Sequence, residues 1–264
     1  VMGIEAFAEA AALLYPELKV EAVEDVDFLA PFKLYRDEPR TLTVQALFRA
    51  EGEDVVADCR LLGYRNLPGQ AEPQETVHFR GRVRLAREIT PAGRRNAPGN
   101  APGEREAVRA GDVYRIYFHG PAYQVLESAW RDGDTVVGRY AANLPPEYRL
   151  EAQPATLPTL MEPRLIELCF QTAGLGELGR KGRMALPLHV DRVRTLRAAP
   201  AGDGTPLFAV TRPGADGSVD AWVVDREGNL YVTLSGYRTV ELPGGVDPER
   251  LEPLRSAMLE TVEV

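Results

Sequence analysis

The clearest candidate for chemistry is a glutamate in an apolar stretch of a predicted helix. Glu167 and Gln171 occur in the segment IELCFQTAG, four residues apart, so that a helix places them on one face. The neighbours of Glu167 are Ile166, Leu168, Cys169 and Phe170. Burial among such side chains raises the pKa of a carboxyl group and keeps it protonated, which suits an acid catalyst. The alternative is a solvated helix glutamate, which these apolar neighbours disfavour.

Three histidines could supply a base, because the pKa of histidine lies near neutrality. His119, in FHGPAYQVL, stands between an aromatic residue and a Gly-Pro turn, and we expect it to line a pocket. His78 and His189 lie in predicted strands, in TVHFRGR and LPLHVDRV. His78 is expected to pair across a sheet. His189 is expected to form a surface pair with Asp191, which lies two residues on and shares its face.

The remaining motifs favour no other chemistry. GLGELG, residues 174–179, satisfies the Gly-x-Gly-x-x-Gly dinucleotide pattern but follows a predicted helix, where glycines commonly terminate the last turn. No zinc spacing, phosphate loop or serine-nucleophile elbow occurs, so no metal is expected. Cys59 and Cys169 lie far apart among apolar neighbours, and we expect free thiols in a reducing compartment.

Composition is that of an ordinary globular protein. The 264 residues are 44% hydrophobic and 27% charged, and the net charge of −8 argues against a nucleic-acid partner. No apolar run approaches the length needed to cross a membrane, and no basic leader followed by an apolar stretch opens the sequence. We therefore expect a cytoplasmic protein.

The elements that must position these residues fall into two groups around a linker at 91–112, which is rich in Pro, Gly and Asn. Before it we predict a helix over 2–15, stopped by Pro16, and strands over 19–29, 41–49, 54–65 and 75–88. After it we predict strands over 113–118 leading into 123–131, and over 134–142, then a helix at 160–173. Four strands follow, over 184–197, 206–212, 219–225 and 229–241, with a hairpin turn at 225–229.

Both groups therefore contain a helix followed by four strands, and each helix carries Ile-Glu. The pattern predicts an α+β protein with a duplicated fold, divided into residues 1–90, the linker 91–112 and residues 113–264. The first copy lacks a counterpart of residues 113–159. We therefore expect the sequence to begin partway into its first copy.

Three stretches resemble a known family. VMGIEAFAEAA (1–11) resembles the central helix of acyl-carrier-protein dehydratases. FHGPAYQVL (118–126) resembles their Tyr-Gly-Pro-x-Phe-Gln segment, and EPRLIELCFQTAG (162–174) resembles their Pro-x-x-x-Asp-x-x-x-Gln segment. Two copies in one chain resemble the double-hotdog dehydratase domains of polyketide synthases and polyunsaturated fatty acid synthases. The resemblance implies two hotdog halves, each a central helix wrapped by an antiparallel sheet.

The resemblance also implies roles for particular residues. The family's catalytic aspartate falls on Glu167, and its tyrosine before Gly-Pro falls on His119. Glu5, the pseudo-symmetric copy of Glu167, is expected to be structural, because such enzymes normally keep one active carboxyl, in the second half. The matched segments imply these substrate-binding positions: His119, Gly120, Pro121, Tyr123 and Gln171.

One departure from the family concerns the base. The family's catalytic histidine lies in a His-x-x-x-Gly-x-x-x-x-Pro segment upstream of the first helix, and this sequence contains no such segment. We therefore expect the chain by itself to be a poor catalyst. His119 is the first candidate if the base lies within it.

The function that the resemblance implies is elimination of water from 3-hydroxyacyl thioesters carried on the phosphopantetheine arm of an acyl carrier protein, with no cofactor of the domain's own. Implied partners are the carrier protein, neighbouring synthase domains and a second copy in a homodimer. An inactive structural or substrate-holding module is one alternative. A hotdog thioesterase, using a carboxylate-activated water, is another, although the pairing of Glu167 with Gln171 favours dehydration.

Overall fold

The computed structural model describes residues 1–33, 40–66, 69, 72–99, 103, 106–145, 158–200 and 204–258. The first half contains α1 (Met2–Leu14), β1 (Lys19–Phe28), β2 (Leu42–Glu51), β3 (Asp54–Arg65) and β4 (Gln74–Ala86). The second begins with β5 (Val108–Arg109), α2 (Ala110–Val113), a 3-10 helix η1 (Pro121–Tyr123), β6 (Leu126–Asp132), β7 (Thr135–Tyr140) and α3 (Pro163–Lys181). It ends with β8 (Ala185–Thr195), β9 (Phe208–Pro213), β10 (Val219–Val224), β11 (Leu230–Glu241) and α4 (Pro248–Met258).

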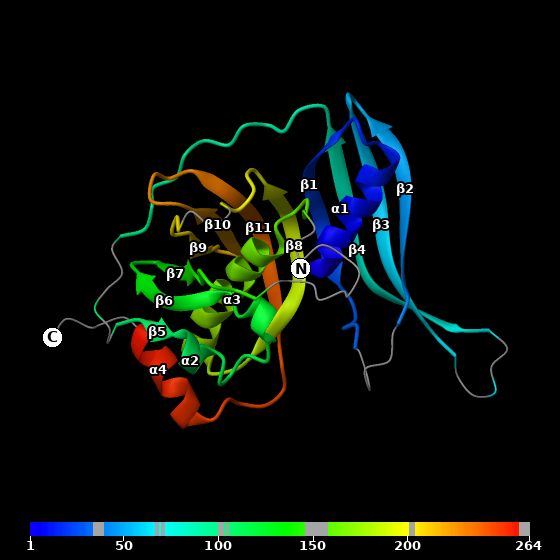
Figure 1. The fold of residues 1–264 in the computed structure, drawn as a ribbon. Coiled ribbons are helices and arrows are strands. Elements are labelled where there is room, and N and C mark those ends of the chain that lie inside the picture. The colour runs from blue at the N-terminus through cyan, green and yellow to red at the C-terminus, as the bar shows by residue number, and fades with distance from the viewer. Residues whose placement is uncertain are drawn as a thin grey trace.

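The strands form one sheet of eleven, in the order β2-β3-β4-β1-β8-β11-β10-β9-β7-β6-β5. Every neighbouring pair is antiparallel, and β1 pairs with β8 where the two halves meet, with Val23 opposite Val193. In Figure 1, α1 lies against the blue and cyan strands, and α3 lies within the green and orange strands. The α+β double hotdog predicted from the sequence is confirmed.

The two halves repeat the same topology. In each, the first strand after the central helix lies at the joint, followed outward by the fourth, third and second: β1-β4-β3-β2 and β8-β11-β10-β9. The Ile-Glu helices therefore occupy equivalent places. Among the described residues, no strand pairs with the outer edge of β2, whereas its equivalent β9 is followed by β7. One continuous sheet runs through both halves, and the boundaries at residues 90 and 112 remain a prediction.

The spacing of apolar residues explains how α1 is buried. Ile4, Phe7, Ala8 and Ala11 recur at the helical period and are at most 1% exposed. Leu13, on another face, is 84% exposed. The helix ends before Pro16, as predicted from the sequence. One apolar stripe thus fixes α1 against β1–β4.

The strand predicted over 113–118 is wrong. α2 ends at Val113, and the chain continues in helical turns, with Tyr114 N donating to Ala110 O and Tyr117 N donating to Val113 O. The alternation of apolar and polar residues in VYRIYF suggested a strand. The backbone instead satisfies its hydrogen bonds locally, because Val113 and Tyr117 are then buried together, one helical turn apart.

The predicted end of the second helix is also wrong, because α3 continues through GLGELG to Lys181. A Cβ on Gly176 would lie 3.0 Å from Val136 Cγ2, and one on Gly179 would lie 2.7 Å from Met258 Cβ. These glycines let β7 and α4 approach the helix. The residue that terminates it is Gly182, in the left-handed conformation at φ 68°. Helix α4 was not predicted, since Pro253 within it is atypical of a helix interior.

Candidate active site

Helix α3 carries the central carboxyl group of the site. Residues around it, including Leu165, Ile166, Leu168 and Cys169, are fully buried, so the helix is held rigidly by packing on several sides. Glu167 is 9% exposed and Gln171 is 2% exposed. Gln171 Nε2 lies 3.0 Å from Glu167 Oε1, which is the contact that their spacing predicts.

His119 reaches the same carboxyl group from the loop before η1. Its Nε2 atom lies 3.0 Å from Glu167 Oε1. The imidazole stacks on Phe118 with ring centroids 5.4 Å apart, and it meets the edge of Tyr117 at 5.6 Å. Gln124 Nε2 donates to His119 O at 3.1 Å and fixes the loop. Oxygen Oε1 of Glu167 therefore accepts from an imidazole and an amide at once.

Two tyrosines that the sequence analysis missed complete the network. Tyr114 donates its hydroxyl to Gln171 Oε1 at 2.8 Å, and Tyr117 donates to Gln171 O at 3.2 Å. A strand over 113–118 would have placed these side chains on opposite faces. A helical interpretation of VYRIY would have placed both on one side, three residues apart, which is the signal that could have found them.

A cavity of about 400 Å³ lies beside Glu167, between the two halves. The first half contributes Phe28 and Phe79, and the second contributes Phe170, Leu186 and Val240. The described polar side chains in its wall include His119, Glu167, Gln171, Tyr117, Tyr237 and Thr239. A cavity that is apolar except around one carboxyl group suits an acyl chain with one reactive polar end.

Glu167 is not kept protonated in the way that the sequence analysis expected. Burial does raise its pKa, but other contacts outweigh burial. These are the hydrogen bond and charge of His119 and the hydrogen bond from Gln171. Together they hold the pKa of Glu167 below its ordinary 4.5. The carboxyl group is therefore charged at neutral pH.

This lowered pKa predicts how stability depends on pH. A carboxyl group with a lower pKa in the folded than in the unfolded state stabilises the fold above its unfolded pKa, and this contribution is lost as the pH falls through the folded pKa. We expect the free energy of unfolding of the parent protein to decrease more steeply below pH 4.5 than that of Glu167→Gln. Urea titrations at a series of pH values measure this, and a difference that stays constant with pH would contradict it.

The other residues predicted to bind substrate lie close by but outside the cavity wall. Gly120 and Pro121 are exposed at the start of η1. Tyr123 donates its hydroxyl to Met2 Sδ at 2.9 Å, so its side chain reaches toward α1. Its carbonyl oxygen accepts from Gln171 Nε2 at 2.8 Å. Substrate binding by these three residues remains a prediction.

The residues expected to have structural roles form hydrogen bonds and ion pairs away from Glu167. Both carboxylate oxygens of Glu5 accept backbone hydrogens ahead of α3, from Leu160 N at 2.6 Å and Met161 N at 2.8 Å. His78 Nδ1 lies 3.1 Å from Ala30 O. His189 pairs with Asp191 at 3.0 Å, as predicted, and also with Asp27 of β1 at 2.7 Å. Cys59 and Cys169 are buried free thiols, also as predicted.

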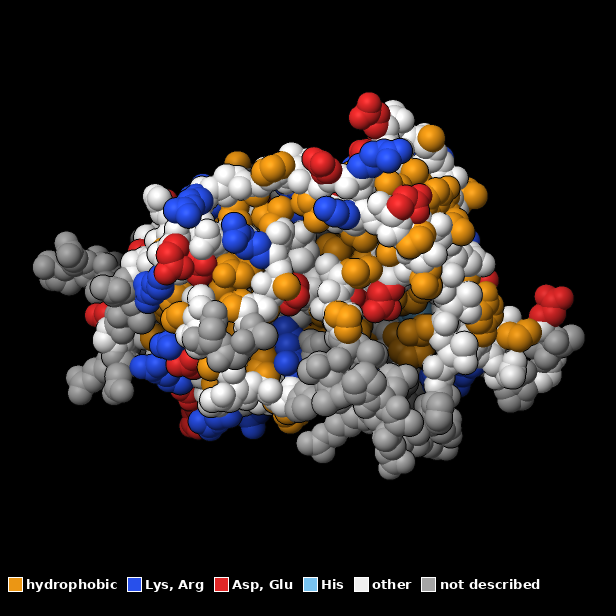
Figure 2. Space-filling view, turned by 45° about the horizontal axis from the view of Figure 1, so that its top comes forward, with side chains coloured by type: hydrophobic (Ala, Val, Ile, Leu, Met, Phe, Trp, Pro, Cys, Tyr) orange, Lys and Arg blue, Asp and Glu red, His pale blue; other side chains and the backbone are white. Residues whose placement is uncertain are grey.

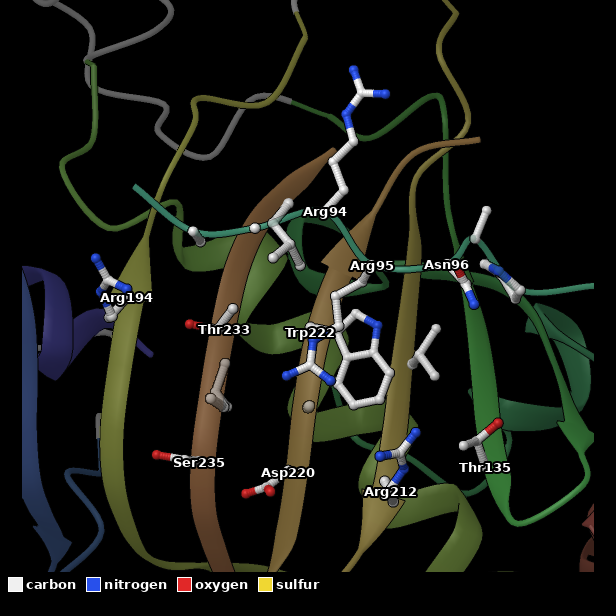
Figure 3. Close-up of a pocket in the computed structure, with 18 of the residues that line it drawn as sticks. Arg94, Arg95, Asn96, Thr135, Arg194, Arg212, Asp220, Trp222, Thr233 and Ser235 are labelled. Atoms are coloured by element: carbon white, nitrogen blue, oxygen red, sulfur yellow. The ribbon is translucent and has the colours of Figure 1, made fainter. Parts of the chain in front are cut away.

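A larger cavity, about 870 Å³, lies on the face of the sheet opposite to α3 (Figure 3). Residues 92–98 cross this face, and Arg95 N donates to Gly228 O at 3.1 Å. The guanidinium of Arg95 lies 4.6 Å from the centre of the Trp222 ring, whereas Arg94 points away from the sheet (Figure 3). This cavity shares no lining residue with the one beside Glu167. It results from the crossing segment and is separate from the hydrogen-bond network around Glu167.

The described part of the chain shows neither a cluster of metal ligands nor a helix suited to span a membrane. No group of three or more His, Cys, Asp and Glu side chains there is placed to hold a metal ion. None of the described helices combines the length and apolar character that a membrane span requires. On the face shown in Figure 2, acidic and basic side chains are interspersed.

Comparison with known proteins places this geometry in a family. A family model described as "Polyketide synthase dehydratase N-terminal domain" matches residues 92–249, more than half of the chain. Polyketide synthase ThaG of Burkholderia thailandensis is 28% identical over 120 residues, which are 45% of this chain and 2% of ThaG. The chain therefore corresponds to a small part of that relative.

Solved structures share the fold. The dehydratase domain from the CurF module of curacin polyketide synthase superimposes with a TM-score of 0.65 at 21% identity, covering 89% of this chain and 81% of that one. Two inactive mutants of CurK dehydratase are also similar. The mutant with phenylalanine in place of a histidine gives a TM-score of 0.61 at 18% identity, over 90% and 83% of the two chains. The mutant with asparagine in place of an aspartate gives 0.60 at 19% identity, over 91% and 84%.

Proposed function

We propose that this chain, which belongs to the polyketide synthase dehydratase family, eliminates water from 3-hydroxyacyl thioesters to give 2-enoyl thioesters. One observation carries the proposal. A buried carboxylate, Glu167, accepts hydrogen bonds from His119 and Gln171 at the wall of an apolar cavity. Dehydration needs a proton donor for the departing hydroxyl in a site that excludes bulk water, and this arrangement supplies both.

The reaction removes one proton and one hydroxide from the substrate. A base takes the proton from the carbon beside the thioester carbonyl, the C–O bond at the next carbon breaks, and the electron pair of the C–H bond becomes the new double bond. The hydroxyl leaves as water with a proton from the His119–Glu167 pair. His119 Nε2 and Glu167 Oε1 are 3.0 Å apart, so either atom can pass that proton on with little movement. We assign the base to the family histidine, for which this sequence contains no matching segment.

The inactive mutants of CurK dehydratase support the assignment of the base to a histidine and of the proton donor to a carboxyl-containing pair. In that protein, one inactive mutant replaces a histidine and another replaces an aspartate. Glu167 corresponds to the family aspartate and provides the same functional group on a side chain longer by one methylene. The substrate would be carried on the phosphopantetheine arm of an acyl carrier protein among neighbouring synthase domains, and the reaction as written needs no further cofactor.

Mass spectrometry of a carrier-bound substrate tests the proposal. The full-length protein is incubated with a 3-hydroxybutyryl group attached to an acyl carrier protein through phosphopantetheine. Loss of one water from the bound acyl group is the expected result. An acyl group that stays intact would favour the inactive substrate-holding module. Release of free 3-hydroxybutyrate would favour the thioesterase. Either of these outcomes would overturn dehydration.

A further inference from the structure

We infer that Tyr114 is a positioning residue of this site: its hydroxyl sets the orientation of the Gln171 amide, so that Gln171 donates to Glu167 instead of opposing it. Tyr114 lies outside the cavity wall and reaches Glu167 only through Gln171. The catalytic meaning of this inference rests on the proposed function. The positioning itself follows from the direction of four hydrogen bonds.

The direction of the first bonds is fixed by the backbone. Leu126 N carries a hydrogen and can only donate, so the oxygen of Tyr114, at 2.8 Å, must accept. The hydroxyl proton of Tyr114 is then free to point elsewhere, and the atom at 2.8 Å is Gln171 Oε1. Burial raises the pKa of Tyr114, so that it remains a donor. The end of the Gln171 side chain that faces Tyr114 is therefore the oxygen.

The opposite end of the amide is fixed independently. A backbone carbonyl can only accept, so the Gln171 atom that lies 2.8 Å from Tyr123 O must be the nitrogen. The second hydrogen on that nitrogen points to Glu167 Oε1 at 3.0 Å. Reversing the amide would set oxygen against oxygen at Tyr123 and Glu167, and would leave the Tyr114 proton facing an NH₂ group. All three contacts select one orientation.

This orientation matters because Glu167 is buried. A donor favours the charged form of a carboxyl group, whereas an opposing oxygen disfavours it. The same Oε1 atom also faces His119, so the amide influences where the shared proton resides. The side chains with titratable groups that act on Glu167 or are acted on by it are His119, Tyr114, Tyr117 and Tyr237. Of these side chains, Tyr114 is the one that holds the Gln171 amide.

Titration of Glu167 by carbon-13 NMR tests the inference without any turnover. Protein labelled at the glutamate carboxyl carbon is titrated as the parent and as Tyr114→Phe, and Glu167→Gln identifies the signal. Loss of the hydroxyl releases the amide, and the midpoint of Glu167 is expected to rise by on the order of one pH unit. An unchanged midpoint would overturn the inference.

A matched control is Tyr117→Phe. It removes a hydroxyl from a buried tyrosine that also contacts Gln171, but at the backbone oxygen instead of the amide. Tyr117 lines the cavity, so its replacement can change turnover. We nevertheless expect the midpoint of the Glu167 titration to stay at the parent value. Equal shifts in both variants would show a general effect of lost packing, and would overturn the assignment to Tyr114.

Two further variants separate positioning from folding. In a Gln171→Leu background, Tyr114→Phe should no longer move the Glu167 midpoint, because the amide through which it acts is gone. Genetically encoded 3-fluorotyrosine at position 114 keeps the shape of the side chain and makes its hydroxyl a stronger donor, so the midpoint should move down. This second variant remains informative if Tyr114→Phe does not fold, and a midpoint that stays fixed in it contradicts the inference.

Kinetics then connect positioning to catalysis. In the full-length protein, Tyr114→Phe should lower kcat with little change in KM, and should move the midpoint of the rate-against-pH curve in the same direction as the NMR midpoint. A shifted NMR midpoint in a protein that never forms enoyl thioester would refute the proposed function and leave the positioning intact. Normal turnover with an unshifted midpoint would refute the positioning alone.

Discussion

Replacing Glu167 by glutamine is expected to lower the rate of dehydration by about 10²–10⁴-fold, which is the usual contribution of a positioned acid or base. The amide has nearly the same shape as the carboxyl group and can keep a contact with His119, so the fold should persist. It cannot share a transferable proton with the imidazole. The measurement is the rate of enoyl thioester formation by the full-length variant and parent protein, at equal concentrations of folded protein.

The pseudo-symmetric Glu5→Gln is the control for this experiment. It makes the same chemical change at the equivalent position of the other central helix. Glu5 accepts from two backbone N–H groups and lies away from the cavity wall, so its replacement should reduce stability without slowing each folded molecule. Full turnover by Glu167→Gln would show that the carboxyl group is not part of the reaction.

Replacing Phe7 by alanine is expected to lower the free energy of unfolding by about 3–5 kcal/mol, the usual cost of removing a phenylalanine from a packed core. Phe7 is completely buried on the face of α1 that packs against the sheet. Its loss leaves a cavity that rigid strands on several sides cannot fill. Urea denaturation followed by circular dichroism measures the change.

Leu13→Ala provides the comparison on the same helix. Leu13 is 84% exposed, and a surface substitution of this kind changes stability by within about 0.5 kcal/mol. Both variants gain the same alanine, and phenylalanine and leucine differ in intrinsic helix propensity by less than about 0.7 kcal/mol, well below the expected difference in stability. Similar losses of stability in the two variants would mean that the α1 face identified as buried is not part of the core.

Local patterns in the sequence predicted the repeated part of the fold well. Ile4, Phe7 and Ala11 recur with the helical period, and the alternation in β3 and β4 matches one face of a sheet, so the chain itself contains the information. The sequence analysis missed elements whose secondary structure depends on contacts with residues far away in the sequence. VYRIYF alternates like a strand, yet Tyr114 and Tyr117 lie in a helical turn in which both hydroxyl groups reach Gln171.

The candidate site shows the same limit. The spacing of Glu167 and Gln171 predicted their contact, and the family resemblance brought His119 to the same region. The charge of Glu167 was predicted wrongly, because the apolar residues beside it in the chain suggested a neutral carboxyl group. His119, whose hydrogen bond and charge lower its pKa, comes from a separate loop. Residues adjacent in the sequence indicate whether a position is buried. They do not indicate which charged groups folding brings close to it.

The strand pair between β1 and β8 has a consequence for how the molecule loses its structure. Backbone hydrogen bonds run from one half into the other without interruption, and Glu5 of α1 also holds the segment that leads into α3. Local opening of either half therefore breaks contacts that belong to both, which makes the two halves a single cooperative unit. Fluctuations that loosen α1 therefore reach helix α3 through shared hydrogen bonds, and the geometry around Glu167 depends on the integrity of both halves.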